Sequence, residues 1–192
     1  MRTVEDRQKL FKETMYTVFR DSDEMSRIVD ELTDSGYFTA PASTKHHANY
    51  EGGLFDHSLN VTNSLLALTD ANNLEWMREQ SPYIIGMFHD LCKMDAYKEN
   101  GGYVYNEFTK DIEREWIYNS DTLYKGHGDK SVILASAYLR LMPEEVACIR
   151  YHMGAFTEKE EWAYFTRAVQ AYPNVLWTHT ADMIATHIDE KE

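Results

Sequence analysis

Cysteine is scarce in this chain of 192 residues, which contains only Cys92 and Cys148. The two lie far apart in apolar stretches and form no CxxC pair, so a disulfide or a thiolate metal ligand is the less favoured interpretation. Cysteines in apolar stretches are typically buried free thiols, and free thiols persist in a reducing compartment. We therefore expect both cysteines to be buried and unpaired, and the protein to be cytoplasmic.

Long apolar runs and basic residues are also in short supply. No stretch approaches the roughly 20 apolar residues that a membrane-spanning helix needs, and the charged residues that follow Met1 do not resemble a signal peptide. Lysine and arginine number 19 against 32 acidic residues, which gives a net charge of −13. A long nucleic acid would need a basic stripe that this chain lacks. We expect no membrane partner and no long nucleic acid, whereas a small anion drawn by bound metal and a few lysines remains compatible.

Apolar side chains recur at helical spacing along most of the chain. The pattern predicts helices over residues 4–20, 23–34, about 54–69, from Pro82 onward, and about 128–141, 143–153, 157–171 and 174–189. Between residues 99 and 124, strand-favouring aromatic residues predict a hairpin with strands near 103–108 and 114–119, after a turn at 100–102. We predict one all-α domain over 1–192, with N-terminal helices over 1–36, a metal-binding helical core over 45–189 and a small β-hairpin insertion near 103–119.

Six histidine and aspartate side chains stand out because they interrupt these apolar helices. They come from five segments: His57, His89-Asp90, His127, His152 and Asp182. Each one alone is more often a hydrogen-bonded core residue than a ligand; Asp182, for example, could be satisfied by its neighbour His179. The adjacent pair His89-Asp90 is harder to explain, since two polar groups are costly in a buried segment unless they are paired or metal-bound. Imidazole and carboxylate ligands together suit Mn, Fe, Co, Ni or Zn.

The order and local context of these residues resemble the HD-domain phosphohydrolase superfamily. Its minimal pattern of His, His-Asp and Asp on an all-helical domain is matched by Gly52-Gly53-Leu54 before His57, by Phe88-His89-Asp90-Leu91-Cys92-Lys93 and by Asp182. The segments Gly126-His127-Gly128-Asp129-Lys130-Ser131 and Arg150-Tyr151-His152-Met153-Gly154 are similar to the subset that holds two metals. Residues 38–45 and 126–131 further resemble small bacterial and phage-borne members, for which no substrate is settled. One departure is Cys92, where relatives often carry glycine.

The resemblance implies a set of metal ligands and a set of substrate contacts. A first divalent ion would be bound by His57, His89, Asp90 and Asp182, and Asp90 would bridge to a second ion held by His127 and His152. Either one or two ions fit the pattern, and Mn, Fe, Co, Ni, Zn and Mg all remain open. Asp90 and Lys93 would be the catalytic residues, with Lys93 meeting the substrate phosphate. Further candidates for substrate contacts are Lys45, His47 and Lys130, although His47 could equally be loop surface.

The chemistry implied is attack of a metal-bound hydroxide on a small nucleotide phosphoester. A phosphodiester, including a cyclic nucleotide, is favoured, and a nucleotidase or a nucleoside triphosphate hydrolase is an alternative. A 3′–5′ exonuclease and a non-catalytic nucleotide-binding sensor are two further alternatives. The aromatic insertion could cover the site and stack a nucleobase, or it could pack the hairpin onto the core. We expect the cytoplasm of a bacterium or of a phage-infected host, and a homo-oligomer remains open.

Overall fold

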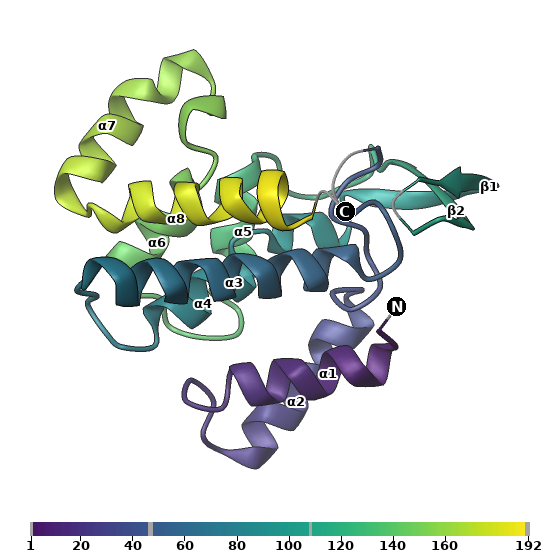
Figure 1. Cartoon of the computed structure of the whole chain (residues 1–192), viewed down its shortest axis with the longest axis horizontal. Coiled ribbons are helices and arrows are strands. Elements are labelled where there is room, and N and C mark those ends of the chain that lie inside the picture. The colour runs from purple at the N-terminus through teal and green to yellow at the C-terminus, as the bar shows by residue number, and fades with distance from the viewer. Residues whose placement is uncertain (1, 46–47, 108, 191–192) are drawn as a thin grey trace.

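The computed structural model describes residues 2–45, 48–107 and 109–190, and these residues are mostly helical (Figure 1). The α-helices are α1 (Val4–Thr14), α2 (Ser22–Asp34), α3 (Gly53–Asn72), α4 (Ser81–Phe88), α5 (His127–Ala135), α6 (Pro143–Tyr151), α7 (Trp162–Ala171) and α8 (Asn174–Ile184). Short helical turns connect or extend them: η1 (Leu91–Met94), η2 (Gly154–Phe156), η3 (Lys159–Glu161) and the π-helical η4 (Ala185–Asp189). The strands β1 (Tyr97–Asn106) and β2 (Asp111–Tyr118) pair antiparallel. In this described part of the chain, no helix has both the length and the apolar character that a bilayer crossing requires.

Helices α3 and α8 pack against each other at the centre of the fold, with α4 on α3 and α6 on α8 (Figure 1). The α1–α2 pair lies on one side of this centre. Buried aromatic rings join the pair to the central helices, with neighbouring centroids between 5.3 Å and 6.2 Å apart: Phe11, Tyr37, Phe38, Phe55 and Phe88. Most of these ring pairs meet edge to face, which is a favourable arrangement for aromatic rings. Both cysteines are buried and free, as the sequence predicts.

The first helix ends earlier than its apolar spacing predicts, at Thr14 and not near residue 20. Met15 caps it, and the Met15 carbonyl accepts two backbone hydrogen bonds across a tight turn. Met15 and Phe19 are both buried, so the turn continues the apolar pattern without continuing the helix. The side chain of Asp21 then caps the start of α2. Two later helices are also shorter than predicted: α5 ends at Ala135, and α7 begins only at Trp162.

The hairpin exists, but its strands and its turn are not where the sequence pattern predicts them. β1 begins at Tyr97, and residues 100–102 lie within it as a bulge, not as a turn. Three residues of β1 there stand opposite a single residue of β2, between the pairs Glu99–Trp116 and Tyr103–Arg114. The chain reverses only after Asn106. Gly101 has a φ of 83°, a conformation that glycine adopts in bulges as well as in turns, so the Asn-Gly-Gly sequence is ambiguous.

Two glycines allow the helices of the centre to approach closely. A Cβ on Gly86 in α4 would lie 2.3 Å from the hydroxyl oxygen of Thr62 in α3. A Cβ on Gly128 in α5 would lie 2.0 Å from the backbone oxygen of Arg150 in α6. Side chains of any size would force these backbones apart. Glycine at the two positions therefore sets the spacing between α3 and α4 and between α5 and α6.

Candidate metal centre

Six His and Asp side chains from five segments meet in one cluster between the central helices. They are His57 on α3, His89 and Asp90 at the end of α4, His127 at the start of α5, His152 at the end of α6 and Asp182 on α8. Their ligand atoms form three overlapping groups, and within each group all atoms lie within 4.8 Å of one another: His57–His89–Asp90, His89–His152–Asp182 and Asp90–His127–His152. These groups could hold a metal ion.

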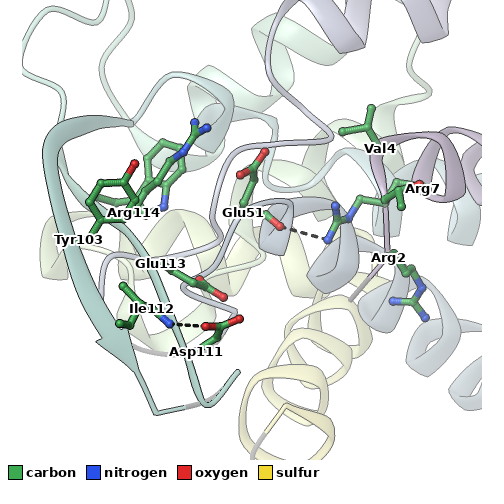
Figure 2. A pocket seen from close by; sticks show the side chains of 11 residues that line it. Arg2, Val4, Arg7, Glu51, Tyr103, Asp111, Ile112, Glu113 and Arg114 are labelled. Carbon is green, nitrogen blue, oxygen red and sulfur yellow. Dashed lines mark hydrogen bonds between the residues drawn. The ribbon is translucent and has the colours of Figure 1, made fainter.

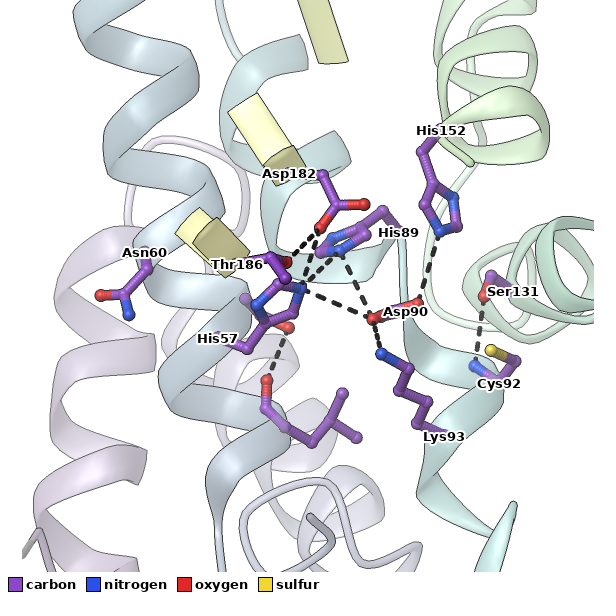
Figure 3. Close-up of polar contacts among 12 residues, drawn as sticks. His57, Asn60, His89, Asp90, Cys92, Lys93, Ser131, His152, Asp182 and Thr186 are labelled. Carbon is purple, nitrogen blue, oxygen red and sulfur yellow. Dashed lines mark hydrogen bonds and ion pairs between the residues drawn. The ribbon is translucent and has the colours of Figure 1, made fainter. Parts of the chain in front are cut away.

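Asp90 stands at the centre of the cluster because its two carboxylate oxygens face different imidazoles (Figure 3). Oδ2 lies 3.6 Å from Nε2 of His57 and 3.6 Å from Nε2 of His89. Oδ1 lies 2.7 Å from Nε2 of His127 and 3.5 Å from Nε2 of His152. One buried carboxylate therefore links the two halves of the cluster, as a ligand shared by two cations would.

Asp182 completes the first half of the cluster. Its Oδ1 lies 3.2 Å from Nε2 of His57, and the Nε2 atoms of His57 and His89 are 3.3 Å apart. The hydroxyl of Thr186 donates to the same Asp182 oxygen at 3.4 Å. Two imidazoles and two carboxylates thus converge on a small volume, and His57, His89 and Asp90 are all buried.

The other ring nitrogen of each histidine is held by a neighbour, which orients the ring. Nδ1 of His89 lies 2.8 Å from the backbone oxygen of Gly86, and Nδ1 of His152 lies 2.7 Å from that of Ile149. A carbonyl oxygen only accepts, so both Nδ1 atoms carry a proton and donate it. In the neutral rings, Nε2 is left with a lone pair facing the cluster, which is the tautomer that a metal ligand needs.

His57 and His127 are held by side chains instead of carbonyls. Nδ1 of His57 lies 3.0 Å from Oε1 of Glu190, and the amide of Asn60 donates to the same oxygen at 3.0 Å. Nδ1 of His127 lies 3.3 Å from Sγ of Cys92. A carboxylate behind a histidine fixes the ring and raises its basicity, so Glu190 is placed to strengthen His57 as a ligand.

Sequence reasoning missed Glu190. It lies in an acidic stretch, where a charged side chain normally faces solvent, yet it is only 6% exposed. Its backbone N–H closes the π-helical turn η4 on the carbonyl of Ala185. No sequence pattern signals its contact with His57, because the contact joins residues 133 positions apart.

Some buried polar atoms of the cluster have no well-formed hydrogen bond to one another. Asp90 Oδ1 and His127 Nε2 are both buried without a well-aligned hydrogen bond, although they lie only 2.7 Å apart. Buried polar atoms are seldom left in this way. Four imidazoles and two carboxylates together form the donor set that suits Mn, Fe, Co, Ni and Zn. The residues present therefore fit one or two divalent cations.

Protonation balances part of the charge in the first half of the cluster. Burial alone would lower the pKa of His57, but hydrogen bonds to the carboxylates of Asp182 and Glu190 outweigh it and raise that pKa to about 9. Burial lowers the pKa of His89 to about 3, so the His89 ring is neutral. A charged imidazole thus lies beside a neutral one, with the negative charge of two carboxylates around the first.

Lys93 lies beside the cluster on η1, with its Nζ 2.6 Å from Oδ2 of Asp90. Burial would raise the pKa of the Asp90 carboxyl, but Lys93 and the adjacent histidines hold it well below its usual range. Burial would lower the pKa of the Lys93 ammonium, and the attraction of Asp90 outweighs it and raises that pKa. Both groups are therefore charged at neutral pH.

The structure describes two of the other residues predicted to contact substrate, Lys130 and Lys45. Lys130 is buried, and its Nζ is paired with the carboxylate of Asp95. Lys45 is exposed and does not line the cavity beside the cluster. His47 lies outside the described residues. Of the three predicted lysines, Lys93 is therefore the one that lies at the cluster.

A cavity of about 430 Å³ opens onto the cluster. Asp90, His127, His152 and Asp182 form part of its lining. Much of the remaining lining is made of cationic, imidazole, aromatic and methionine side chains: Lys93, Tyr97, Tyr118, Met153, Phe156, His179, Met183 and His187. A hollow of this size and mixed character suits a small molecule.

A second cavity, of about 490 Å³, lies between the hairpin and the start of α1 (Figure 2). None of the six clustered His and Asp residues lines it. Its arginines are already paired with carboxylates: Arg2 and Arg7 with Asp56, and Arg114 with Glu99. Although it is the larger hollow, it offers no comparable chemistry.

Comparison of the chain with protein-family models, with curated proteins and with solved structures gave no match in any of the three. What the structure supports directly is a mostly helical protein with a buried His/Asp cluster that could bind metal. The function is therefore inferred from the chemistry of that cluster and of the cavity beside it.

Proposed function

We propose that this protein is a metal-dependent phosphohydrolase of the HD-domain superfamily and that it hydrolyses a small nucleotide phosphoester. The observation that carries the proposal is the position of Asp90, each of whose oxygens faces a pair of imidazole Nε2 atoms at 2.7–3.6 Å. Two cations sharing such a carboxylate can clamp the attacking and leaving oxygens of a phosphoryl group. The ordered His, His-Asp and Asp motifs of the sequence agree with this chemistry.

The resemblance to the HD-domain superfamily implies two overlapping ligand sets. One ion would be held by His57, His89, Asp90 and Asp182, and the other by Asp90, His127 and His152. Two of the three groups in the structure, His57–His89–Asp90 and Asp90–His127–His152, support this division. When bound, the ions would supply Lewis-acid chemistry that draws electron density from phosphoryl oxygens and acidifies water. The nitrogen donors favour Mn, Fe, Co, Ni or Zn, and the carboxylates keep Mg compatible.

Lys93 would bind the substrate phosphate. It lines the cavity and carries a positive charge at neutral pH, because the attraction of Asp90 outweighs burial and raises the pKa of its ammonium. An ammonium at this position can donate a charge-assisted hydrogen bond to a phosphate oxygen while the reacting phosphorus lies over the cluster. Met153 and Met183 supply apolar surface in the lining of the same cavity.

Among phosphoesters, a phosphodiester such as a cyclic nucleotide is favoured, and hydrolysis of a nucleoside monophosphate or triphosphate is the alternative. The cavity of about 430 Å³ suits a ligand of mononucleotide size. The net charge of −13 argues against the exonuclease, because a nucleic-acid track is normally basic. A non-catalytic sensor would use the same cavity but would bind nucleotide without turnover.

The test is to supply the purified protein with Mn²⁺, Co²⁺, Ni²⁺ or Mg²⁺ and to offer mono-, di-, tri- and cyclic nucleotides. We expect ester hydrolysis with at least one metal, and two ions per chain by elemental analysis.

Asp90→Asn should lose metal and activity together, because the shared ligand loses its charge. Asp121→Asn, which alters an exposed acid, should keep both. Lys93→Ala should keep its metal and lose turnover or substrate affinity.

Four outcomes would count against parts of this proposal. Full activity of Asp90→Asn, or no hydrolysis with any metal and nucleotide, would overturn the phosphohydrolase. Tight nucleotide binding with Mn²⁺ but no turnover would favour the sensor. A single ion per chain, with His127 and His152 unliganded, would remove the two-metal version.

A further inference from the structure

The hairpin presents two tyrosines to the cavity, one of them half-buried and the other exposed. Tyr97 begins β1, Tyr118 ends β2, and the two pair directly across the sheet. Their ring centroids are 5.4 Å apart at an interplanar angle of 56°. Both rings line the cavity beside the cluster, and Tyr118 is 75% exposed. An aromatic face this open at a cavity is free to stack against a ligand.

A third ring reaches the same cavity from a different element. Phe156 ends η2, shortly after the cluster residue His152, and it is 67% exposed. Its ring centroid lies 6.3 Å from that of His179, which also lines the cavity. Exposure of a phenyl ring forgoes hydrophobic stabilisation, so a ring in this position is well suited to being covered by an apolar or aromatic ligand.

Lys93, which would bind the substrate phosphate, lines the same cavity as these rings. Tyr97 follows Lys93 by four residues, and both side chains line the cavity. Burial raises the pKa of Tyr97 to about 12, although the positive charge of Lys93 opposes the shift, so the phenol keeps its proton near that charge. A small ligand with its phosphate at Lys93 would therefore extend its other end toward the tyrosine pair.

The described lining of this cavity offers few side chains that read the edge of a base. Arg, Asn, Gln and Glu do not occur there, its two aspartates belong to the cluster, and Lys93 is assigned to the phosphate. The hydroxyls of Ser43 and Thr186 remain, and a hydroxyl does not select one base over another. Stacking on aromatic rings, in contrast, accepts every base because each has a π-face.

From these contacts we infer that Tyr97, Tyr118 and Phe156 form a stacking subsite for the planar base of a nucleoside phosphate, with little selection among bases. The inference rests on the proposed function and deepens it, because it names the residues that would hold the base of the nucleotide. The phosphate lies at Lys93 and the cluster, and the base lies against the aromatic rings.

The test compares ligands that differ in the base alone. Calorimetric titration, in the presence of Mn²⁺, measures binding of adenosine 5′-monophosphate, uridine 5′-monophosphate and ribose 5-phosphate. We expect both nucleotides to bind about tenfold more tightly than ribose 5-phosphate, or better, and to differ little from each other.

Tyr118→Ala should remove most of the affinity advantage of the nucleotides without changing the affinity for ribose 5-phosphate. Tyr105→Ala is the matched control, since Tyr105 is 57% exposed on the same hairpin but does not line the cavity.

Phe156→Leu gives a second measurement on the other element, and circular dichroism confirms that each variant is folded. Equal affinity for the three ligands, or an unchanged nucleotide advantage in both Tyr118→Ala and Phe156→Leu, would overturn the inference. Failure of the proposed function is a separate result: no hydrolysis in the nucleotide screen would remove the enzyme but leave the binding comparison intact. Conversely, equal kcat/KM for nucleotides and ribose 5-phosphate would keep a phosphohydrolase and remove the base subsite.

Discussion

Each histidine of the cluster uses its two ring nitrogens for different purposes. Nδ1 is held by a neighbour, which is a backbone carbonyl for His89 and His152, a carboxylate for His57 and a thiol for His127. Nε2 is thereby directed at Asp90 or Asp182. The neighbours therefore decide where each proton resides, and with it how well each ring can serve as a ligand.

Glu190→Gln tests the carboxylate behind His57. The glutamine oxygen can still accept a hydrogen bond from Nδ1, but the negative charge that strengthens the ring as a base is gone. We expect metal affinity to fall about 10- to 100-fold, measured by titration of the metal-free protein with Mn²⁺. Asp189→Asn is the matched control, because it alters an exposed neighbouring acid that bonds Ser64. Equal affinity in both variants would leave Glu190 with a structural role alone.

The raised pKa of His57 predicts that metal binding releases a proton. With a pKa of about 9 despite its burial, the ring is charged at neutral pH, and a charged ring cannot bind a metal. Between about pH 7 and pH 9 we expect apparent affinity to rise about tenfold per pH unit, since one proton leaves His57 for each ion bound there. Titration of Mn²⁺ in two buffers of different ionisation enthalpy measures the proton count. Binding with no proton released would contradict a charged His57.

At the scale of the elements, the spacing of helices brings the six His and Asp side chains together. Gly86 lets α4 approach Thr62 of α3, which carries His89 toward His57. Gly128 lets α5 approach Arg150 of α6, which carries His127 toward His152. Each half of the cluster therefore depends on one close contact between backbones, and the two contacts can be altered separately.

Gly128→Ala should loosen the second half of the cluster and leave the first intact. The added methyl would lie 2.0 Å from the Arg150 carbonyl oxygen, so α5 has to move away from α6. We expect a loss of about 1–3 kcal/mol in unfolding free energy and one bound ion in place of two, measured by thermal unfolding and elemental analysis. Ser136→Ala, at the exposed end of α5, should change neither. Retention of two tightly bound ions would show that α5 is not positioned by this contact.

The elements also show how far sequence reasoning reaches. Helical periodicity predicts α2, α3 and α6 to within a few residues. It extends the first helix beyond the end of α1, because Met15 and Phe19 keep the apolar spacing through a turn. Strand-favouring aromatics predict the hairpin, whereas its bulge looks like a turn because both use glycine. Sequence motifs pick out the six side chains that the structure brings together, and metal binding by them stays a prediction. No sequence motif marks the hydrogen-bond partners of those side chains. Every residue has a backbone carbonyl, and Glu190 is distant from His57 in the sequence.

At the scale of the whole molecule, five separate segments direct polar side chains to one buried place. The cluster spans from His57 to Asp182. Helices α1 and α2 contribute no residue to it, and Phe11 of α1 packs with Tyr37 and Phe38, which follow α2. Burial of so many polar groups is costly unless they are paired or bound to cations. The chain as a whole carries a net charge of −13, which repels polyanions. The proposed binding of a phosphate would therefore depend on cations at the cluster and on Lys93.

Cations that bind all five segments should therefore stabilise the fold as a whole. An ion that binds the folded chain and not the unfolded chain contributes about 2.7 kcal/mol at a hundredfold excess over its Kd, which for a chain of this size raises Tm by about 5–10 °C. We expect Mn²⁺ to produce such a rise and chelation to reverse it, measured by differential scanning calorimetry. Asp90→Asn should remove the rise because both halves of the cluster lose their shared carboxylate, while Asp121→Asn should keep it. If Asp90→Asn showed the same rise as the unaltered protein, the stabilising ions would have to bind elsewhere, and the link between the five segments would be packing alone.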